Sequence, residues 1–327
     1  MEKILIIPIL LSFFVTIFAL PNWIKRAKKA GLAGKDMNKN SKEEIAEAGG
    51  VIVVLSFVIG ILSYIAIKTF YFKTIENMVE IFALMSVILW VAFIAFTDDI
   101  LGWKIGLNKK TRIILMIFAA FPLMVINAGQ SKMMGIDFGI IYPLLVIPIG
   151  IVGASTTFNF LAGYNGLEAS QGILILSGLA IVTFLTDNTW LSVICISMVI
   201  CLLAFLFWNW NPARVFPGDV LTYSIGALIA TIAILGNIEK IAVFFFIPYI
   251  FETILKSRGS LKKESFAKVN PDNSLEMPYD KIYGLEHLAL KFLKRIKKSK
   301  KVYESEVVLS INLFQAVIIV LGILILI

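Results

Sequence analysis

Three polar segments of the sequence could do chemistry, and each borders a long apolar run. They are the acidic pair Asp98-Asp99, the segment 158–168 (FNFLAGYNGLE) and the segment 215–219 (VFPGD). An unsatisfied polar group in hydrocarbon is strongly destabilising, so such segments survive at membrane depth only where they line a watery site. The sequence therefore predicts a catalytic face on a membrane enzyme.

Acidic residues mark the first and third segments. On a helix the neighbours Asp98 and Asp99 point about 100° apart, so they cannot share one ligand face. One could hold a metal ion or nucleophile while the other meets a lysine; the alternative is a water-exposed helix end. In the third segment Asp219 opens an apolar run, where backbone N–H groups attract anions, and Arg214 could grip phosphate. Membrane anchoring by Arg214, with Asp219 as N-cap, is the alternative.

The segment 158–168 contains more than a turn requires. Asn165-Gly166 favours a tight turn with positive φ, and Gly163 lets a ligand approach the backbone. A capped turn needs one asparagine and one glycine, whereas this segment also carries Asn159 and a glutamate. Carboxylate and amide oxygens suit Mg²⁺, and lysines neutralise phosphate, so the three segments together predict phosphoryl transfer.

Composition predicts that these segments belong to a membrane protein. Hydrophobic residues make up 59% of the chain and the mean hydropathy is +0.89, whereas soluble domains average about 45–50% apolar residues. Apolar runs of roughly 17–25 residues can span a bilayer as helices. We therefore expect an all-α, polytopic integral membrane protein with about ten transmembrane helices. The expected spans are 4–24, 49–68, 79–97, 112–128, 139–158, 168–187, 190–208, 219–236, 240–256 and 306–327.

Basic residues are distributed unevenly among the connections. Of the 30 Lys and Arg residues, 25 follow the first, third, seventh or ninth span. By the positive-inside rule these connections are cytoplasmic, so the catalytic face is cytoplasmic and both termini lie outside. The net charge of +8 then reflects contact with anionic membrane lipids, and no nucleic-acid partner is expected.

One domain is expected over residues 1–327, with a cytoplasmic loop at 257–305 between the ninth and tenth spans. From Leu285 onward this loop alternates apolar and basic residues, which suits an amphipathic helix on an anionic membrane surface. A solvated helix packed on its own loops is the alternative. A transporter is a rival function, but it would need polar groups spaced through the membrane, and no internal repeat is evident.

The three polar segments, in this order and spacing, resemble the polyprenyl-phosphate N-acetylhexosamine-1-phosphate transferase family. The similarity points to its eukaryotic and archaeal branch, the UDP-N-acetylglucosamine–dolichyl-phosphate N-acetylglucosamine-1-phosphotransferases. Further matching stretches are GKDMNK at 34–39, IAEAGGV at 45–51 and SLEM at 274–277. The resemblance implies a ten-helix transferase that moves N-acetylglucosamine-1-phosphate from UDP-N-acetylglucosamine to dolichyl or polyprenyl phosphate. It would release UMP and begin N-glycan assembly.

The resemblance also implies roles for the acidic and amide residues. Asn159 and Asp219 would hold Mg²⁺, with Mn²⁺ as an alternative. Asp98 and Asp99 would be catalytic: they would lie beside the metal and position or deprotonate the lipid phosphate. Direct attack by that phosphate and a covalent carboxylate intermediate both remain open.

Basic and nucleotide-binding residues follow from the same resemblance. Lys109 matches the family's phosphate-binding lysine to within about a residue, and Lys110 is its rival. Arg214 would bind phosphate. The residues expected to bind the nucleotide are Met37, Glu47, Gly163, Asn165 and Phe216, with Phe216 stacked on uracil.

One motif departs from the family. Bacterial members carry a histidine-rich motif in the ninth connection and eukaryotic members an Arg-His-Arg run, whereas residues 262–265 here read KKES. That loop touches the sugar in the family, so another UDP-sugar donor and the phospho-N-acetylmuramoyl-pentapeptide-transferase reaction remain alternatives. A lipid-phosphate transporter is the non-enzymatic rival. The resemblance further implies a homodimer, and abundant Ile and Lys favour an archaeal cell membrane as the location.

Overall fold

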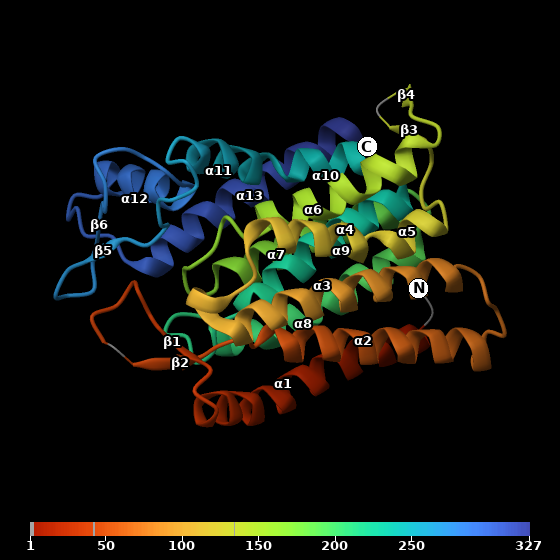
Figure 1. Cartoon of the computed structure of the whole chain (residues 1–327), viewed down its shortest axis with the longest axis horizontal. Helices are drawn as coiled ribbons and strands as arrows, with labels where there is room; N and C mark the ends of the chain where they lie inside the picture. The colour runs from red at the N-terminus through yellow and green to blue at the C-terminus, as the bar shows by residue number, and fades with distance from the viewer. Residues whose placement is uncertain (1–2, 42, 134) are drawn as a thin grey trace.

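The computed structural model describes residues 3–41, 43–133 and 135–327, and it consists mainly of helices that run side by side (Figure 1). Within these residues, seven helices are long and apolar enough to cross a membrane, so the expectation of a polytopic membrane protein is confirmed. They are α1 (Ile6–Lys29), α2 (Gly50–Ala66), α3 (Met78–Ile105), α7 (Leu167–Leu185), α8 (Thr189–Asn209), α9 (Gly218–Gly236) and α13 (Glu304–Leu326).

The other three expected spans contain shorter helices. Two of them are broken, between α4 and α5 and between α10 and α11, whereas η3 continues directly into α6; a proline stands in the first turn of α5, α6 and α11, where its missing N–H is tolerated. The number of transmembrane spans therefore stays a prediction. These helices are α4 (Lys109–Ala119) with α5 (Phe121–Val125), η3 (Tyr142–Val146) with α6 (Ile147–Phe158), and α10 (Glu239–Phe245) with α11 (Ile247–Ser257); η1 (Lys3–Leu5) precedes α1 and η2 (Ile67–Tyr71) extends α2.

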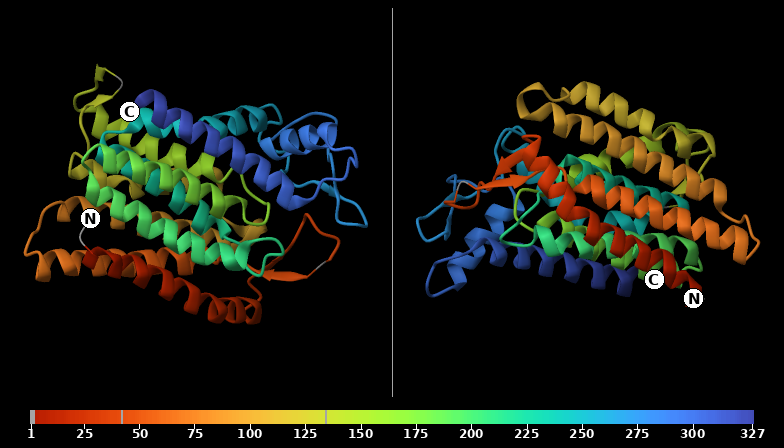
Figure 2. Two further views of the ribbon diagram at one scale, coloured as in Figure 1. Left: turned by 180° about the vertical axis from the view of Figure 1, so that it is seen from behind. Right: turned by 90° about the horizontal axis from the view of Figure 1, so that it is seen from below.

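Short antiparallel strand pairs lie at both ends of the helical bundle. At one end β1 (Ala33–Lys35) pairs with β2 (Glu44–Ala46), and β5 (Lys268–Val269) pairs with β6 (Leu275–Glu276). At the other end β3 (Lys132–Met133) pairs with β4 (Ile136–Asp137), and both chain termini lie at that same end (Figures 1 and 2). Termini at one end are what an even number of spans requires.

Helix α9 forms the centre of the bundle. It is apolar on all sides apart from its first turn, which is the pattern of a helix surrounded by other helices, and it packs against α2, α3 and α6. Most of its residues are buried, Leu221, Ile225, Leu228 and Ile232 completely. Helix α9 begins at the end that carries β1 and β2, where Val215 pairs with Ala46, and Asp219 lies in the first turn of α9.

The amphipathic stretch of the long loop coincides with α12 (Leu285–Ile296), which lies at the same end of the molecule (Figure 1). Leu285 and Leu290 are buried, and α12 packs against α11 and α13. The opposite face exposes Leu288, Phe292 and Ile296. One face thus packs on the protein, whereas contact of the exposed face with a membrane surface stays a prediction.

Candidate active site

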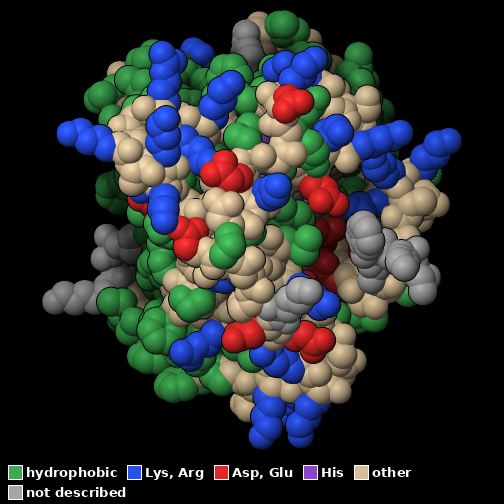
Figure 3. Space-filling model, turned by 90° about the vertical axis from the view of Figure 1, so that its left-hand side faces the viewer, with side chains coloured by type: hydrophobic (Ala, Val, Ile, Leu, Met, Phe, Trp, Pro, Cys, Tyr) green, Lys and Arg blue, Asp and Glu red, His purple; other side chains and the backbone are tan. Residues whose placement is uncertain are grey.

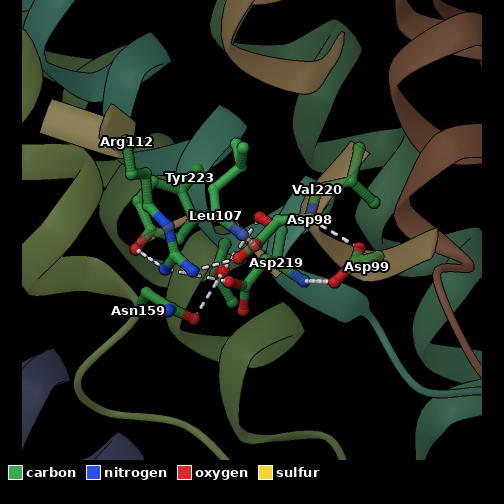
Figure 4. Close-up of polar contacts among 9 residues, drawn as sticks. Asp98, Asp99, Leu107, Arg112, Asn159, Asp219, Val220 and Tyr223 are labelled. Atoms are coloured by element: carbon green, nitrogen blue, oxygen red, sulfur yellow. Dashed lines mark hydrogen bonds and ion pairs between the residues drawn. The ribbon is translucent and has the colours of Figure 1, made fainter. Parts of the chain in front are cut away.

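The end of α3 is joined directly to the beginning of α9. Asp99 accepts the backbone N–H of Asp219 through Oδ1 at 2.9 Å and that of Val220 through Oδ2 at 3.1 Å (Figure 4). Gly218 has a φ of +70°, and a Cβ on it would lie 2.5 Å from Asp99 Oδ2. Glycine therefore permits both the backbone conformation and the close approach of the carboxylate. Asp99 thus fixes the position of Asp219.

Arg112 of α4 connects the acidic residues of α3 and α9. Its guanidinium pairs with Asp98, lies 3.3 Å from Asp219 Oδ2 and donates to the Tyr223 hydroxyl at 2.7 Å (Figure 4). Asp98 also accepts the backbone N–H of Leu107 at 2.5 Å. As expected from their spacing, Asp98 and Asp99 face different partners, and the basic partner of Asp98 is an arginine.

Asn159 completes this arrangement from the end of α6. Its Oδ1 accepts a hydrogen bond from the Thr222 hydroxyl at 2.8 Å, and the same hydroxyl lies 3.1 Å from the backbone carbonyl of Asp219. Figure 4 shows Asn159, Arg112 and the two aspartates converging from separate helices. The structure therefore brings together side chains that are separated by up to 121 positions in the sequence, namely Asp98, Arg112, Asn159 and Asp219.

Two cavities meet at this cluster. One has a volume of about 290 Å³ and the other about 550 Å³, and Glu47, Asp99 and Asp219 line both. Asp98 and Arg112 line the larger cavity. Figure 3 views this end of the molecule and shows a hollow with acidic side chains, while Lys and Arg side chains project around it. Two ligands could therefore approach the carboxylates from different directions.

All five residues expected to bind the nucleotide line the smaller cavity. Other residues that were not expected to bind the nucleotide also line it, among them Asp36 and Phe266. A Cβ on Gly163, whose φ is +104°, would lie 2.8 Å from the Phe266 ring, so glycine allows this close contact. Phe266 directly follows the KKES stretch, which is the only sequence signal that pointed to this loop. The five residues are Met37, Glu47, Gly163, Asn165 and Phe216.

The three basic residues selected from the sequence lie elsewhere. Lys109 and Lys110 are exposed in the first turn of α4, and Arg214 is exposed with its guanidinium 5.5 Å from the Trp208 ring centre. None of them is among the described residues that line the two cavities. Arg112, which sequence reasoning missed, lies one turn after Lys109. The signal that could have found it is Asn108, whose side chain accepts the Thr111 N–H and fixes where α4 begins.

Glu47 follows β2 at the shared wall of the two cavities. Burial and the neighbouring Asp219 carboxylate raise the pKa of Glu47 from 4.5 to about 7. The folded protein therefore retains a proton between these values that the unfolded chain releases. The contribution of Glu47 to the free energy of unfolding is full below pH 4.5, falls as pH rises, and is lost above about 7.

Glu47→Gln should remove the loss of unfolding free energy that Glu47 causes as pH rises. In metal-free protein we expect the variant to melt a few degrees above the unaltered protein at about pH 8 and at the same temperature near pH 4.5, because glutamine mimics the protonated acid. Thermal unfolding in detergent at both pH values measures this. Glu44→Gln, at the exposed first residue of β2, is the matched control and should give no pH-dependent gain. Equal melting temperatures of Glu47→Gln and the unaltered protein at about pH 8 would contradict the assignment.

The acidic cluster suits a hard cation that leaves some of its coordination positions free for the substrate. The Arg112 guanidinium pairs with two carboxylates, those of Asp98 and Asp219, and Asp99 and Glu47 add two more acidic side chains to the walls of the same cavity. Asn159 and Asp219 lie at neighbouring helix ends, where the Thr222 hydroxyl contacts both Asn159 Oδ1 and the backbone carbonyl of Asp219, and both residues line the smaller cavity. Among the described residues no group of three or more His, Cys, Asp or Glu forms a ready-made cage. This donor set fits Mg²⁺, which binds one or two protein carboxylates and keeps its other positions for water and phosphate.

Comparison with known proteins agrees with this site. The model of glycosyl transferase family 4 matches residues 81–237, which include Asp98, Asp99, Asn159 and Asp219. A Saccharolobus solfataricus protein, provisionally named a UDP-N-acetylglucosamine–dolichyl-phosphate N-acetylglucosaminephosphotransferase, is 36% identical over 88% of each chain. The Dictyostelium discoideum protein of that name is 26% identical over 71% of this chain and 66% of its own. A Geobacillus phospho-N-acetylmuramoyl-pentapeptide-transferase is 28% identical over 78% of this chain and 82% of its own. With similarity over most of its length and the acidic cluster inside the matched region, the chain belongs to glycosyl transferase family 4.

Proposed function

We propose that this protein transfers N-acetylglucosamine-1-phosphate from UDP-N-acetylglucosamine to dolichyl or polyprenyl phosphate and releases UMP, the first step of N-glycan assembly. The names of the archaeal and Dictyostelium relatives support this reading. The observation that carries it is the placement of Asp98, Asp99, Asn159, Asp219 and Arg112 at the junction of two cavities. Such a site can hold a nucleotide diphosphate on one side and receive a second phosphate from the other.

The reaction balances without any further reactant. An oxygen of the lipid phosphate bonds to the β-phosphorus of the donor, and the bond between that phosphorus and the oxygen of UMP breaks. Because a lipid phosphate is already anionic near neutral pH, direct attack needs no nucleophilic carboxylate. Positioning and electrostatic stabilisation then supply the catalysis, as is general for phosphoryl transfer.

Each polar residue of the cluster has a defined task in this proposal. Asn159 and Asp219 would hold Mg²⁺, which when bound neutralises charge on the diphosphate. Arg112 presents a planar guanidinium to phosphate oxygens, and Asp98 orients it. Asp99 keeps the first turn of α9, and with it Asp219, in place. Mn²⁺ is the alternative cation.

The smaller cavity suits the nucleoside. Phe216 supplies an aromatic face for the base, and its backbone is fixed by a hydrogen bond from its N–H to the Ala46 carbonyl at 2.7 Å. Gly163 and Phe266 form the opposite part of the wall, and Met37 lies at its exposed edge. An aromatic face with glycine backbone alongside is a common way to hold a flat base.

A separate apolar cavity of about 320 Å³ suits the acceptor's hydrocarbon chain. It lies between α6, α9 and α10, and its walls are lined by small residues such as Gly150, Gly153 and Ala230. Along η3 and α6 it extends from Tyr142 to Thr157, two residues before Asn159. A prenyl chain in this cavity would therefore bring its phosphate close to the acidic cluster.

Gly153→Phe should block this cavity selectively. A Cβ on Gly153 meets no atom within 4 Å, so the phenyl ring enters the open space without displacing the fold. We expect the KM for dolichyl phosphate to rise about tenfold through lost apolar contact, with the KM for UDP-N-acetylglucosamine unchanged. Steady-state kinetics with each substrate varied separately measures both values. Ile181→Phe, on an exposed face of α7, is the control, and an unchanged lipid KM in Gly153→Phe would count against this path.

The site end of the molecule is the cytoplasmic end in this proposal, and the protein spans the membrane about ten times. The positive-inside distribution of Lys and Arg supports that orientation. Both termini lie at the opposite end of the bundle (Figure 1) and would face outward. A homodimer in the membrane is part of the proposal on the basis of the family resemblance alone.

Purified protein tests the proposed function most simply. Incubation with Mg²⁺, dolichyl phosphate and UDP-N-acetylglucosamine should release UMP only when lipid and metal are both present. A lipid-phosphate transporter would release none. Replacing the donor by UDP-N-acetylmuramoyl-pentapeptide or another UDP-sugar separates this function from the alternatives, because the preferred donor gives the highest kcat/KM.

A further inference from the structure

The turn between α6 and α7 takes its conformation from distant parts of the chain. Gly163 and Gly166 both have positive φ, and between them Asn165 lines the smaller cavity. The turn lies outside regular secondary structure. Its shape therefore depends on side chains that bind its backbone and on those that bind Asn165.

Two carboxylates hold Asn165, which is 4% exposed. Glu304, the first residue of α13, accepts the Asn165 backbone N–H at 2.8 Å and its Nδ2 at 3.3 Å. Asp36, in the connection after α1, accepts the same Nδ2 at 2.8 Å. Asp36, from the connection after α1, and Glu304, from the first turn of α13, thus both accept a hydrogen bond from the same side-chain amide.

This arrangement determines which way the Asn165 amide points. The Asn165 NH₂ group donates to both carboxyl groups and therefore faces Glu304 and Asp36. The remaining polar atom of the side chain is Oδ1, an acceptor. Asn165 is therefore fixed as a hydrogen-bond acceptor in the wall of the cavity.

Neighbouring contacts hold the two carboxylates in turn. Lys39 lies 2.9 Å from Asp36 Oδ2 and 3.8 Å from Glu304 Oε2. Asn38, which is 1% exposed, donates to the Gly163 carbonyl at 2.9 Å and accepts the Ala267 N–H at 3.2 Å. The connection after α1 therefore joins the turn, α13 and the Phe266 loop into one rigid wall.

We propose that Glu304 is a positioning residue that, with Asp36, sets Asn165 as an acceptor and so favours nucleoside diphosphates whose base offers a ring N–H. Uracil has such an N–H between its two carbonyl groups, whereas cytosine carries a lone pair at that ring nitrogen. The inference rests on the proposed function, since it assigns the smaller cavity to the donor nucleotide. The preference for uridine then originates in the first turn of the last helix.

Glu304→Gln tests this directly. A glutamine whose oxygen accepts the Asn165 backbone N–H turns its NH₂ group toward Asn165 Nδ2, so the orientation of the Asn165 amide is then held by Asp36 alone and opposed by the new donor. The experiment measures binding of UDP and of CDP to detergent-purified full-length protein by calorimetry. The expected result is that UDP affinity falls about tenfold and the UDP-to-CDP affinity ratio narrows, as loss of a charge-assisted hydrogen bond implies. The kcat for UDP-N-acetylglucosamine should change little, because Asn165 lies outside the acidic cluster.

Glu306→Gln is the matched control. Glu306 lies on the same turn of α13 but pairs with Lys297 at 2.6 Å, so its loss should leave UDP and CDP binding unchanged. If Glu304→Gln does not fold, Asp36→Asn decides by the same readout, because it removes the other carboxylate on Asn165 Nδ2. Unchanged UDP affinity and base preference in the folded variant would overturn the assignment of Glu304. Failure of the unaltered protein to bind UDP would instead remove the proposed function, and this inference with it.

Discussion

The Asp219→Asn variant is expected to lose about three orders of magnitude in kcat while remaining folded. Asp219 lies at the junction of the two cavities and faces Arg112, so its charge acts on both the proposed metal and the phosphate chemistry. Asparagine keeps the size of the side chain and removes the charge. UMP release by the purified variant, with its thermal unfolding, measures the effect.

Two comparisons sharpen this prediction. Asp187→Asn, in the turn between α7 and α8, changes an exposed carboxylate that is not among the described residues lining the two cavities, and it should leave kcat unchanged. Asp99→Asn should lower both kcat and melting temperature, because an amide cannot accept the two N–H groups at the start of α9 through two oxygens. Full activity in both Asp219→Asn and Asp99→Asn would show that the active site lies elsewhere.

Arg112→Ala is expected to reduce kcat about 10²–10³-fold, the usual effect of losing one preorganised donor for developing charge. The substitution also leaves Asp98, which is 9% exposed, without its basic partner. Arg112→Lys should recover only part of the activity. An ammonium group is a point charge and cannot reach Asp98, Asp219 and Tyr223 together as the guanidinium does.

Lys109→Ala and Arg214→Ala are the controls for Arg112. Both side chains are exposed, and exposed cations contribute little through single contacts, so we expect changes below about threefold. Kinetics of the three alanine variants, measured side by side with both substrates, compares them. If kcat fell further in Lys109→Ala or Arg214→Ala than in Arg112→Ala, the phosphate-binding residue would be the lysine or arginine expected from the sequence and not Arg112.

The helices could be predicted from the sequence because their signal is local. Each expected span coincides with a helix or a pair of helices, since long apolar runs have few alternatives in a membrane. The breaks in two of them, between α4 and α5 and between α10 and α11, lie next to prolines in the sequence. Whether α10 and α11 cross the bilayer as one unit depends on their neighbours. The different directions of Asp98 and Asp99 also followed from helical geometry alone.

The partners of the site residues could not be predicted in the same way. Arg112 reaches Asp98 because α4 packs against α3 and α6, and that packing is not encoded near Arg112 in the sequence. Glu304 and Phe266 meet the turn at Asn165 and Gly163 across more than a hundred residues. The residue types of segment 158–168 predicted that it forms part of a site. Which residues contact it could be learned only from the three-dimensional structure.

The position of the β-phosphorus after reaction tests the central claim most directly. The protein would be incubated with Mg²⁺, dolichyl phosphate and UDP-N-acetylglucosamine labelled at the β-phosphorus, and the label followed in the lipid and nucleotide fractions. Transfer of the sugar phosphate predicts that the label moves into the lipid fraction while unlabelled UMP is released. Label that remains in UDP, with the sugar alone on the lipid, or label that stays in the intact donor would contradict the account.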